Sequence, residues 1–348
     1  MGVLSAGAWS ESSHLPALAA RDDVELVVVS RPDLERARRV AGQFGAMHGV
    51  DDWRSALRYE LDAVVVSSPP NAHEEMVVEA LESGAHVLCE KPFALEAGSA
   101  SRMVQAARDH GRQLLVGFGW AATPMFRRAR ALLTEGGLGR IEYVTMHLVV
   151  ATRPLLLGGL DGGWGGSGIS DKATYVDPAI SGGGAAAVSM SHELGILLWL
   201  LERRPVTEVV ARMYPQSERL DLHDAAILTL AGGVTASVSC VSTHPVTTRP
   251  EWYLGIQGTV ADLWLDSALD RWRLSAADGT ASETFKAGDG VYDPGAPTNQ
   301  LIDIAVGKRQ GAEPGMSGEL ALAVVEVTDA LYLSASEGCA VQLRGEKP

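Results

Sequence analysis

The chain has 348 residues, of which 46% are hydrophobic, so it exceeds the length at which one core usually stops growing and two globular domains are expected. Its net charge of -14 excludes nucleic acid and anionic membranes as expected partners, because both would be repelled. Cys89, Cys240 and Cys339 are widely spaced, and no leader or long apolar run occurs, so we expect a cytoplasmic protein without disulfides, membrane spans or metal sites.

The first third of the chain alternates short β-branched runs with helical patterns. The runs predict strands at Met1–Leu4, Val24–Val29, Ala63–Val66, His86–Leu88 and Gln113–Val116. Helical spacing separates several of them, at Leu34–Phe44, Glu74–Ser83 and Ser99–His110. Parallel neighbours need crossover connections of this length, so an α/β domain with a doubly wound parallel sheet is predicted over residues 1–118.

The pattern changes over residues 119–348, which predict a second, α+β domain with a largely antiparallel open sheet. Its strands are expected at Ile141–Val150, Glu208–Met213, Ala225–Leu230, Val234–Val241, Trp252–Gln257 and Asp262–Leu265. Its helices are expected at Pro124–Glu135, His192–Leu201 and Gly318–Ser336.

A dinucleotide fingerprint belongs where the first strand turns into a helix, because a helix N-terminus offers free N–H groups and a positive dipole end to a pyrophosphate. Here Gly7 keeps the middle glycine, while Ser5 and Ser10 replace the first and third. We expect cofactor contacts from Ser5, Gly7, Ala8 and Trp9. An ordinary strand-to-helix turn is the alternative.

Ser30 and Arg31 end the second predicted strand, where a carboxylate would bind the ribose 2′-hydroxyl of NAD. A hydroxyl and a guanidinium can instead hold a 2′-phosphate, so the sequence favours NADP(H), with NAD(H) as the second choice. The alternative is an Arg31 that is only a solvated residue before the next helix.

Two further segments carry a family resemblance. Ser67-Ser68-Pro69-Pro70-Asn71-Ala72-His73 and, after Gly84, Glu90-Lys91-Pro92 resemble the motifs of the Gfo/Idh/MocA family of sugar and cyclitol oxidoreductases. The resemblance runs from residue 1 to about 342. It implies a Rossmann domain followed by a substrate-binding and oligomerisation domain. The implied cofactor contacts are Ser68, Pro69, Asn71, His73, Glu90 and Lys91.

The resemblance makes Lys91 the catalytic and substrate-orienting residue. An ammonium beside the nicotinamide can donate a hydrogen bond to the reacting oxygen and stabilise developing alkoxide charge. A lysine that is merely exposed in a loop is the alternative.

The run Gly182-Gly183-Gly184 and His192 resemble the family's second motif, in which the histidine exchanges the substrate hydroxyl proton and an aspartate orients the sugar or the histidine. Val188 stands where that aspartate would be, so His192 lacks its usual partner. Glu193 cannot simply replace it, because neighbouring helical residues diverge by about 100°. A His192 packed without chemistry is the alternative.

Substrate contacts are expected from Lys91, His192, Trp164, Tyr175 and Asp177. Trp164 lies in a Gly-rich stretch that can fold over a sugar, since aromatic faces pack on pyranose C–H groups; a poorly ordered insertion is the alternative. His223 is a further substitute partner for His192, and Asp224 matches an acidic family position read as structural.

The sequence therefore predicts hydride transfer between NADP(H) and a hydroxyl or ketone carbon of a sugar, cyclitol or glycosylated small molecule. A tightly bound cofactor used for transient oxidation in elimination or hydrolysis is one alternative, and a non-catalytic cofactor-binding sensor is another. The family pairs subunits sheet to sheet, which implies a homodimer or homotetramer.

Overall fold

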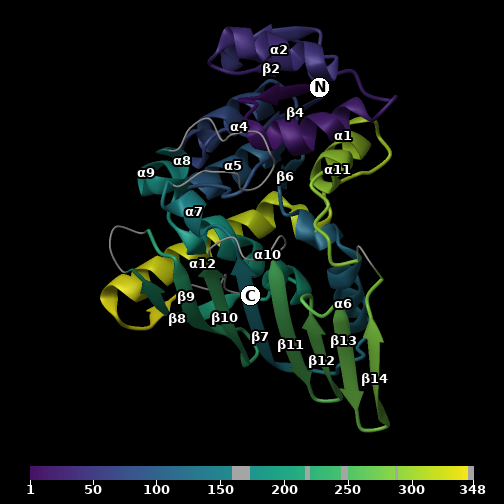
Figure 1. Cartoon of the computed structure of the whole chain (residues 1–348), viewed down its shortest axis with the longest axis vertical. Coiled ribbons are helices and arrows are strands. Elements are labelled where there is room, and N and C mark those ends of the chain that lie inside the picture. Colours follow the sequence, from purple (N-terminus) through teal and green to yellow (C-terminus); the bar gives the residue numbers. More distant parts are fainter. Residues whose placement is uncertain (159–172, 216–219, 244–249, 287–288, 344–348) are drawn as a thin grey trace.

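The computed structural model describes residues 1–158, 173–215, 220–243, 250–286 and 289–343. Two sheets organise this part of the chain, one near each end of the molecule, with helices between them (Figure 1). The predicted α/β architecture is confirmed. No helix within the described ranges is long and apolar enough to cross a membrane.

The first sheet has six parallel strands in the order β3-β2-β1-β4-β5-β6. The strands are β1 (Gly2–Leu4), β2 (Val28–Ser30), β3 (His48–Val50), β4 (Ala63–Val66), β5 (His86–Cys89) and β6 (Leu114–Val116). Its crossover helices are α1 (Leu15–Ala19), α2 (Leu34–Phe44), α3 (Trp53–Ala56), α4 (His73–Glu82) and α5 (Ala97–Asp109). The strand order reverses direction at β1, which is where ligands bind in doubly wound sheets, beyond the carboxyl ends of the strands.

The second sheet has nine strands in the order β14-β13-β12-β11-β7-β10-β9-β8-β15. They are β7 (Ile141–Val150), β8 (Val206–Tyr214), β9 (His223–Leu230), β10 (Val234–Ser242), β11 (Glu251–Gly258), β12 (Ala261–Asp266), β13 (Arg271–Ala276), β14 (Gly279–Thr284) and β15 (Val341–Gln342). The β7–β10 pair is parallel, and the other described pairs of this sheet are antiparallel. The predicted, largely antiparallel sheet is confirmed.

The longer helices of this half are α6 (Pro124–Thr134), α10 (Ser191–Leu200), α11 (Ala296–Ala305) and α12 (Gly318–Glu337). Shorter ones are α7 (Arg153–Leu156), α8 (Ala173–Val176) and α9 (Pro178–Ser181). Single turns of 3-10 helix are η2 (Pro70–Ala72), η3 (Gly119–Ala122) and η5 (Pro314–Met316), and π-helical turns are η1 (Ser10–His14) and η4 (Ala186–Met190).

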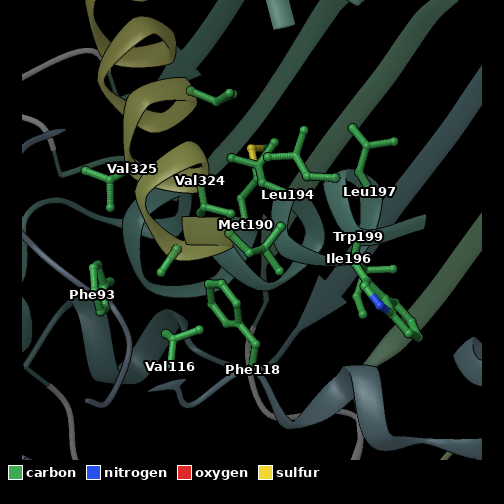
Figure 2. Packing of buried hydrophobic residues seen from close by; sticks show 14 of the residues in the cluster. Phe93, Val116, Phe118, Met190, Leu194, Ile196, Leu197, Trp199, Val324 and Val325 are labelled. Atoms are coloured by element: carbon green, nitrogen blue, oxygen red, sulfur yellow. The ribbon is translucent and has the colours of Figure 1, made fainter. Parts of the chain in front are cut away.

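Helix α12 joins the two layers. It contacts α5 beside the first sheet, and α10 and β8 of the second half. Figure 2 shows Phe93 and Phe118 from the first half beside Val324 of α12 and Leu194 of α10. This apolar contact fixes the loop after β5 against the start of α10, which positions the site.

Helix α11 returns to the first sheet, although it comes late in the chain. It lies beside α1 (Figure 1), and Leu301 and Ile302 are fully buried in a cluster with Val3 and Leu88. We propose the division into residues 1–118 and 119–348, with α11 completing one face of the first domain.

Candidate functional site

The turn after β1 lies at the carboxyl edge of the first sheet, between β2 and β4. Ser5 has a left-handed backbone with φ of 57°, and its amide donates to Ser30 Oγ over 3.0 Å. A Cβ built on Gly7 would meet nothing within 4 Å, so the backbone faces open space there. The helical turns of η1 and α1 follow directly. This arrangement leaves room for a pyrophosphate at a helix N-terminus.

Ser30 and Arg31 lie at the end of β2, next to this turn. Ser30 has no exposed surface, and its hydroxyl accepts the Ser5 amide, so it stabilises the turn. Arg31 Nη1 donates to the Ala6 carbonyl over 2.7 Å and lies 3.3 Å from Glu11 Oε1. The guanidinium therefore lies over the turn after β1.

The loop after β4 carries the Ser-Pro-Pro-Asn segment. Ser67 hydrogen-bonds Ser10, and the buried Ser68 hydroxyl has no hydrogen-bond partner among the described residues. Asn71 is exposed and Pro69 half-buried. A buried hydroxyl without a partner among those residues fits contact with a bound ligand group at this edge.

His73 lies behind that loop with no exposed surface. Its Nδ1 lies 3.1 Å from the Phe93 carbonyl oxygen and its Nε2 lies 2.8 Å from that of Ser68. Burial lowers the pKa of His73. The side chain therefore connects the loop after β4 to the loop after β5 and supports both.

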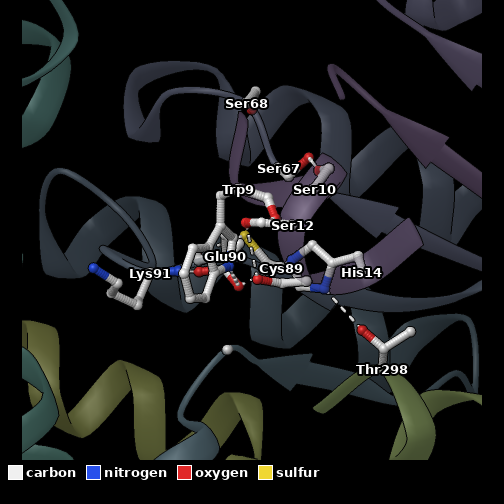
Figure 3. Close-up of polar contacts among 12 residues, drawn as sticks. Trp9, Ser10, Ser12, His14, Ser67, Ser68, Cys89, Glu90, Lys91 and Thr298 are labelled. Atoms are coloured by element: carbon white, nitrogen blue, oxygen red, sulfur yellow. Dashed lines mark hydrogen bonds and ion pairs between the residues drawn. The ribbon is translucent and has the colours of Figure 1, made fainter. Parts of the chain in front are cut away.

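The Glu90 carboxylate, at the end of β5, is surrounded by donors (Figure 3). Trp9 Nε1 donates to Oε1 over 2.9 Å, His14 Nε2 lies 3.1 Å from the same oxygen, and the Lys91 amide donates to Oε2 over 3.0 Å. Burial opposes ionisation, but His14, Lys91 and Trp9 outweigh it and lower the pKa of Glu90. A Cβ on Gly117 would come within 2.6 Å of Oε1, so the neighbouring strand end needs glycine.

Lys91 begins the loop after β5, and the Lys91–Pro92 peptide is cis. Its ammonium points away from the Glu90 carboxylate (Figure 3) and donates to the main-chain oxygen of Val188 over 3.2 Å. Burial lowers the pKa of Lys91, while the charge of Glu90 raises it by a smaller amount. Lys91 is thus a half-buried cation held by one carbonyl of η4.

His192 lies in the first turn of α10, four residues after that carbonyl. Its ring meets the edge of Phe118 at a centroid distance of 5.7 Å and that of Tyr292 at 6.2 Å. Its Nδ1 has no hydrogen-bond partner in the described part of the chain. Burial, with the positive charge of Lys91, lowers the pKa of His192 well below its ordinary value of 6.5. The ring is therefore neutral at neutral pH.

The position of the missing aspartate is filled through its backbone. The Val188 side chain is buried, while its carbonyl accepts from Lys91. Glu193 is directed to the sheet instead, where its Oε1 accepts the Ser239 amide over 3.3 Å, and burial raises its pKa well above 4.5. Glu193 does not replace the aspartate, as the sequence indicated.

The Gly182-Gly183-Gly184 turn is held by two residues that the sequence did not single out, Asp221 and Tyr332. Asp221 Oδ1 accepts the Gly184 amide over 3.2 Å and Oδ2 accepts the Ala186 amide over 2.6 Å. Tyr332 Oη donates to the same Asp221 Oδ1 over 2.6 Å. These bonds fix the segment that leads into η4 and α10.

Tyr292 is a third residue missed by sequence reasoning. It precedes α11, and its ring contacts Trp9, Trp120 and His192 at centroid distances of 6.2, 5.0 and 6.2 Å. Burial raises the pKa of its hydroxyl, and the charge of Glu90 adds to this. The residue stands alone in a Gly- and Pro-containing segment, so no periodic pattern marks it.

The other predicted substrate contacts divide. Tyr175 is half-buried on α8, and burial, with the charge of Glu90, raises the pKa of its hydroxyl to about 12. Asp177 is exposed, and its carboxylate accepts the Ala179 amide over 2.9 Å as the cap of α9. His223 is exposed and stacks on Tyr214. Trp164 lies outside the described residues.

Comparisons with known proteins agree with the two-sheet architecture. A family model described as an oxidoreductase family with an NAD-binding Rossmann fold matches residues 1–118, and one described as the GFO/IDH/MocA C-terminal domain matches residues 126–263. The two matched segments take in most of the chain.

Two curated relatives align over most of their length. The dTDP-3,4-didehydro-2,6-dideoxy-alpha-D-glucose 3-reductase of Actinomadura kijaniata is 27% identical over 76% of this chain and 74% of its own. The D-xylose 1-dehydrogenase (NADP(+)) 2 of Haloferax volcanii is 26% identical over 98% and 99%. A solved structure of levoglucosan dehydrogenase with NADH and L-sorbose has a TM-score of 0.81 at 19% identity, over 99% of this chain and 98% of that one. This last likeness is one of fold.

Proposed function

The chain belongs to the Gfo/Idh/MocA family of oxidoreductases, and from this premise we propose that it transfers a hydride reversibly between NADP(H) and a CH–OH or ketone carbon. The substrate is a sugar, a cyclitol or a glycosylated small molecule. The observation that carries the proposal is the hydrogen bond from the half-buried Lys91 ammonium to the Val188 carbonyl of η4. The neutral ring of His192 follows four residues later, in the first turn of α10. Two of the relatives are named as a reductase of a dTDP-sugar and as a D-xylose dehydrogenase, which supports this substrate class.

The residues at the carboxyl edge of the first sheet fit a dinucleotide. The open backbone at Gly7 and the orphaned Ser68 hydroxyl would hold it, with Ser5, Ala8 and Trp9 lining the same turn. Asn71 and Pro69 lie on the neighbouring loop. When bound, the nicotinamide supplies the centre that accepts or donates the hydride.

We place the preference with NADP(H) over NAD(H). The end of β2 carries Arg31 where a carboxylate would exclude a 2′-phosphate, and Arg36 lies beside it through Glu11. The H. volcanii relative is named for NADP(+), while the levoglucosan dehydrogenase structure contains NADH. NAD(H) is therefore the second choice.

In the oxidative direction, Lys91 and His192 divide the work on the reacting oxygen. Lys91 Nζ gives one N–H to the Val188 carbonyl and has two left to bind that oxygen and stabilise its developing negative charge. His192 Nδ1 has no hydrogen-bond partner within the described ranges and the ring is neutral, so it accepts the hydroxyl proton as the C–H hydrogen leaves as hydride. Tyr175 and Trp164 would contact the rest of the substrate, with Asp177 at its margin.

The test is a substrate panel with the purified chain. Sugars and cyclitols are offered with NADP⁺ and with NAD⁺, their keto forms with the reduced cofactors, and both substrate and cofactor are followed. Net cofactor turnover with at least one substrate is expected. Substrate conversion without net turnover would favour transient oxidation for elimination or hydrolysis, and cofactor binding without any conversion would favour a sensor.

We also propose a homodimer or homotetramer. Three large apolar side chains are exposed on the nine-stranded sheet: Tyr143, Ile227 and Trp264. The cross-strand register places all three on the same face of the sheet. Large exposed side chains on a sheet face suit burial against another copy. The mass in solution, compared with that of Trp264→Lys, tests this.

A further inference from the structure

A carboxylate lies between two guanidinium groups beside the cofactor turn. Glu11 Oε1 is 3.0 Å from Arg36 Nη2 and 3.3 Å from Arg31 Nη1, so one oxygen accepts from both arginines. The three side chains are 16%, 24% and 10% exposed, respectively. Dissolved salt screens the interactions among three such shielded charges only weakly.

Three elements bring this triad to the end of β2. Glu11 lies in η1, directly after the cofactor turn, and Arg31 follows the last residue of β2. Arg36 lies in the first turn of α2, and its amide donates to the capping carboxylate of Asp33 over 3.0 Å. In a doubly wound sheet, the adenosine ribose binds next to this strand end.

We propose that Glu11 is an internal competitor for the ribose 2′-phosphate and so determines how strongly the site prefers NADPH to NADH. The inference rests on the proposed function, because it assigns a residue to that same cofactor site. A guanidinium fork binds carboxylate and phosphate with the same donors. A 2′-phosphate must therefore displace Glu11 or bind beside its negative charge, whereas a 2′-hydroxyl meets neither penalty.

The electrostatics of Arg31 agree with this role. Burial lowers the pKa of Arg31, the like charge of Arg36 lowers it further, and the charge of Glu11 opposes both. Two close guanidinium groups favour a nearby anion, and the Glu11 carboxylate contacts both of them, while Asp33 also raises the pKa of Arg31. The Glu11 carboxylate thus holds the two arginines in position, but it reduces the binding free energy that a 2′-phosphate gains from them.

The test is a fluorescence titration of the full chain with NADPH and NADH at equal ionic strength, after removal of carried-over cofactor. Glu11→Gln keeps the size and hydrogen bonding of the side chain but removes its charge. It should tighten NADPH binding at least about tenfold and change NADH binding less than about threefold. Glu35→Gln, which removes an exposed charge from the same helix as Arg36, is the matched control and should change both less than about threefold.

Arg36→Gln supplies an independent measurement, which keeps the idea open to refutation if Glu11→Gln does not fold. It should weaken NADPH binding about tenfold and leave NADH binding nearly unchanged. Equal changes for the two cofactors, or no change, in either variant would overturn the inference and show that the triad only stabilises the turn. If the unaltered chain binds neither cofactor, the proposed function itself fails.

Discussion

The Lys91 ammonium is held by the main-chain carbonyl of Val188, the residue at the position of the family's aspartate. The Val188 oxygen binds the ammonium without adding a negative charge, and burial, with the charge of Lys91, lowers the pKa of His192. The site therefore holds a cation, which can stabilise negative charge on the reacting oxygen, and an unprotonated imidazole, which has a lone pair for a proton.

Replacing Lys91 by methionine removes the charge but keeps most of the volume. We expect kcat/KM to fall about a thousandfold, because the alkoxide charge loses its partner, while the Kd for NADPH changes less than about threefold. Steady-state kinetics and cofactor titration measure the two effects. Lys308→Met, which removes an exposed lysine paired with Asp23, is the control. Near-normal turnover in Lys91→Met would contradict the assignment, and loss of folding would make Lys91 structural.

Single residues were predictable where a motif marked them and not where only packing did. Lys91, His192 and the missing aspartate at Val188 follow from the sequence pattern. Asp221, Tyr332 and Tyr292 do not, because their partners lie far away along the chain. The supporting roles of Ser30 and His73 depend on burial, which a motif does not reveal.

At the scale of elements, the Gly-rich turn before η4 is a packing requirement rather than a flexible loop. A Cβ on Gly184 would lie 2.1 Å from the Asp221 carbonyl oxygen, and a Cβ on Gly183 2.0 Å from Tyr332 Oη. Because the backbone approaches so closely, Asp221 and Tyr332 can hydrogen-bond to the turn. The position of the turn then determines where α10 begins and where His192 lies.

Gly184→Ala should therefore lower the free energy of unfolding by about 3 kcal/mol and reduce turnover, because backbone must move to admit the methyl group. Gly42→Ala is the matched change, since its Cβ in α2 meets nothing within 4 Å, and it should raise stability by about 0.5 kcal/mol. Urea unfolding of both variants measures this. Equal effects would show that the turn is not tightly packed.

The buried carboxyl of Asp224, on β9, predicts a pH dependence of stability. Burial, with the charge of Asp221, raises its pKa to about 10 from 3.8. Between those values the folded chain keeps a proton that the unfolded chain has lost, so this contribution to stability is full at low pH and declines as the pH rises. Charges of Asp221 and Glu193 face it from neighbouring elements.

Asp224→Asn removes that titration. We expect its free energy of unfolding to fall less than that of the unaltered chain between about pH 5 and about pH 9, as measured by urea unfolding. Parallel curves for the two proteins would contradict a protonated Asp224.

The sequence located the long elements because their periodicity is strong, and it missed the short edge strands. β14 is exposed at every position and β3 is half-exposed with a glycine at its centre, so neither has an apolar alternation to read. β2 begins at Val28 instead of Val24, because pairing with β1 starts there.

Across the whole molecule, the helices α11 and α12, late in the chain, pack against elements formed by its first third. Helix α12 packs on both halves, and α11 completes the core of the first sheet, with Thr298 hydrogen-bonded to His14 Nδ1 over 2.7 Å. His14 in turn lies against Glu90, so α11 contacts the support of the Lys91 loop. Such long-range pairings are invisible to local patterns, which is why the site was predicted by motif and its supports were not.

Lys91 and His192 are proposed to form one site at which net hydride transfer takes place. The most direct measurement gives the purified chain NADPH carrying deuterium at nicotinamide C4 together with keto-sugars and keto-cyclitols, and analyses products by mass spectrometry. We expect at least one alcohol to gain deuterium at the carbon that bears the new hydroxyl, and no gain with Lys91→Met. A chain that binds NADPH and yet passes no deuterium to any product, or a Lys91→Met variant that passes it as readily as the unaltered chain, would contradict the account.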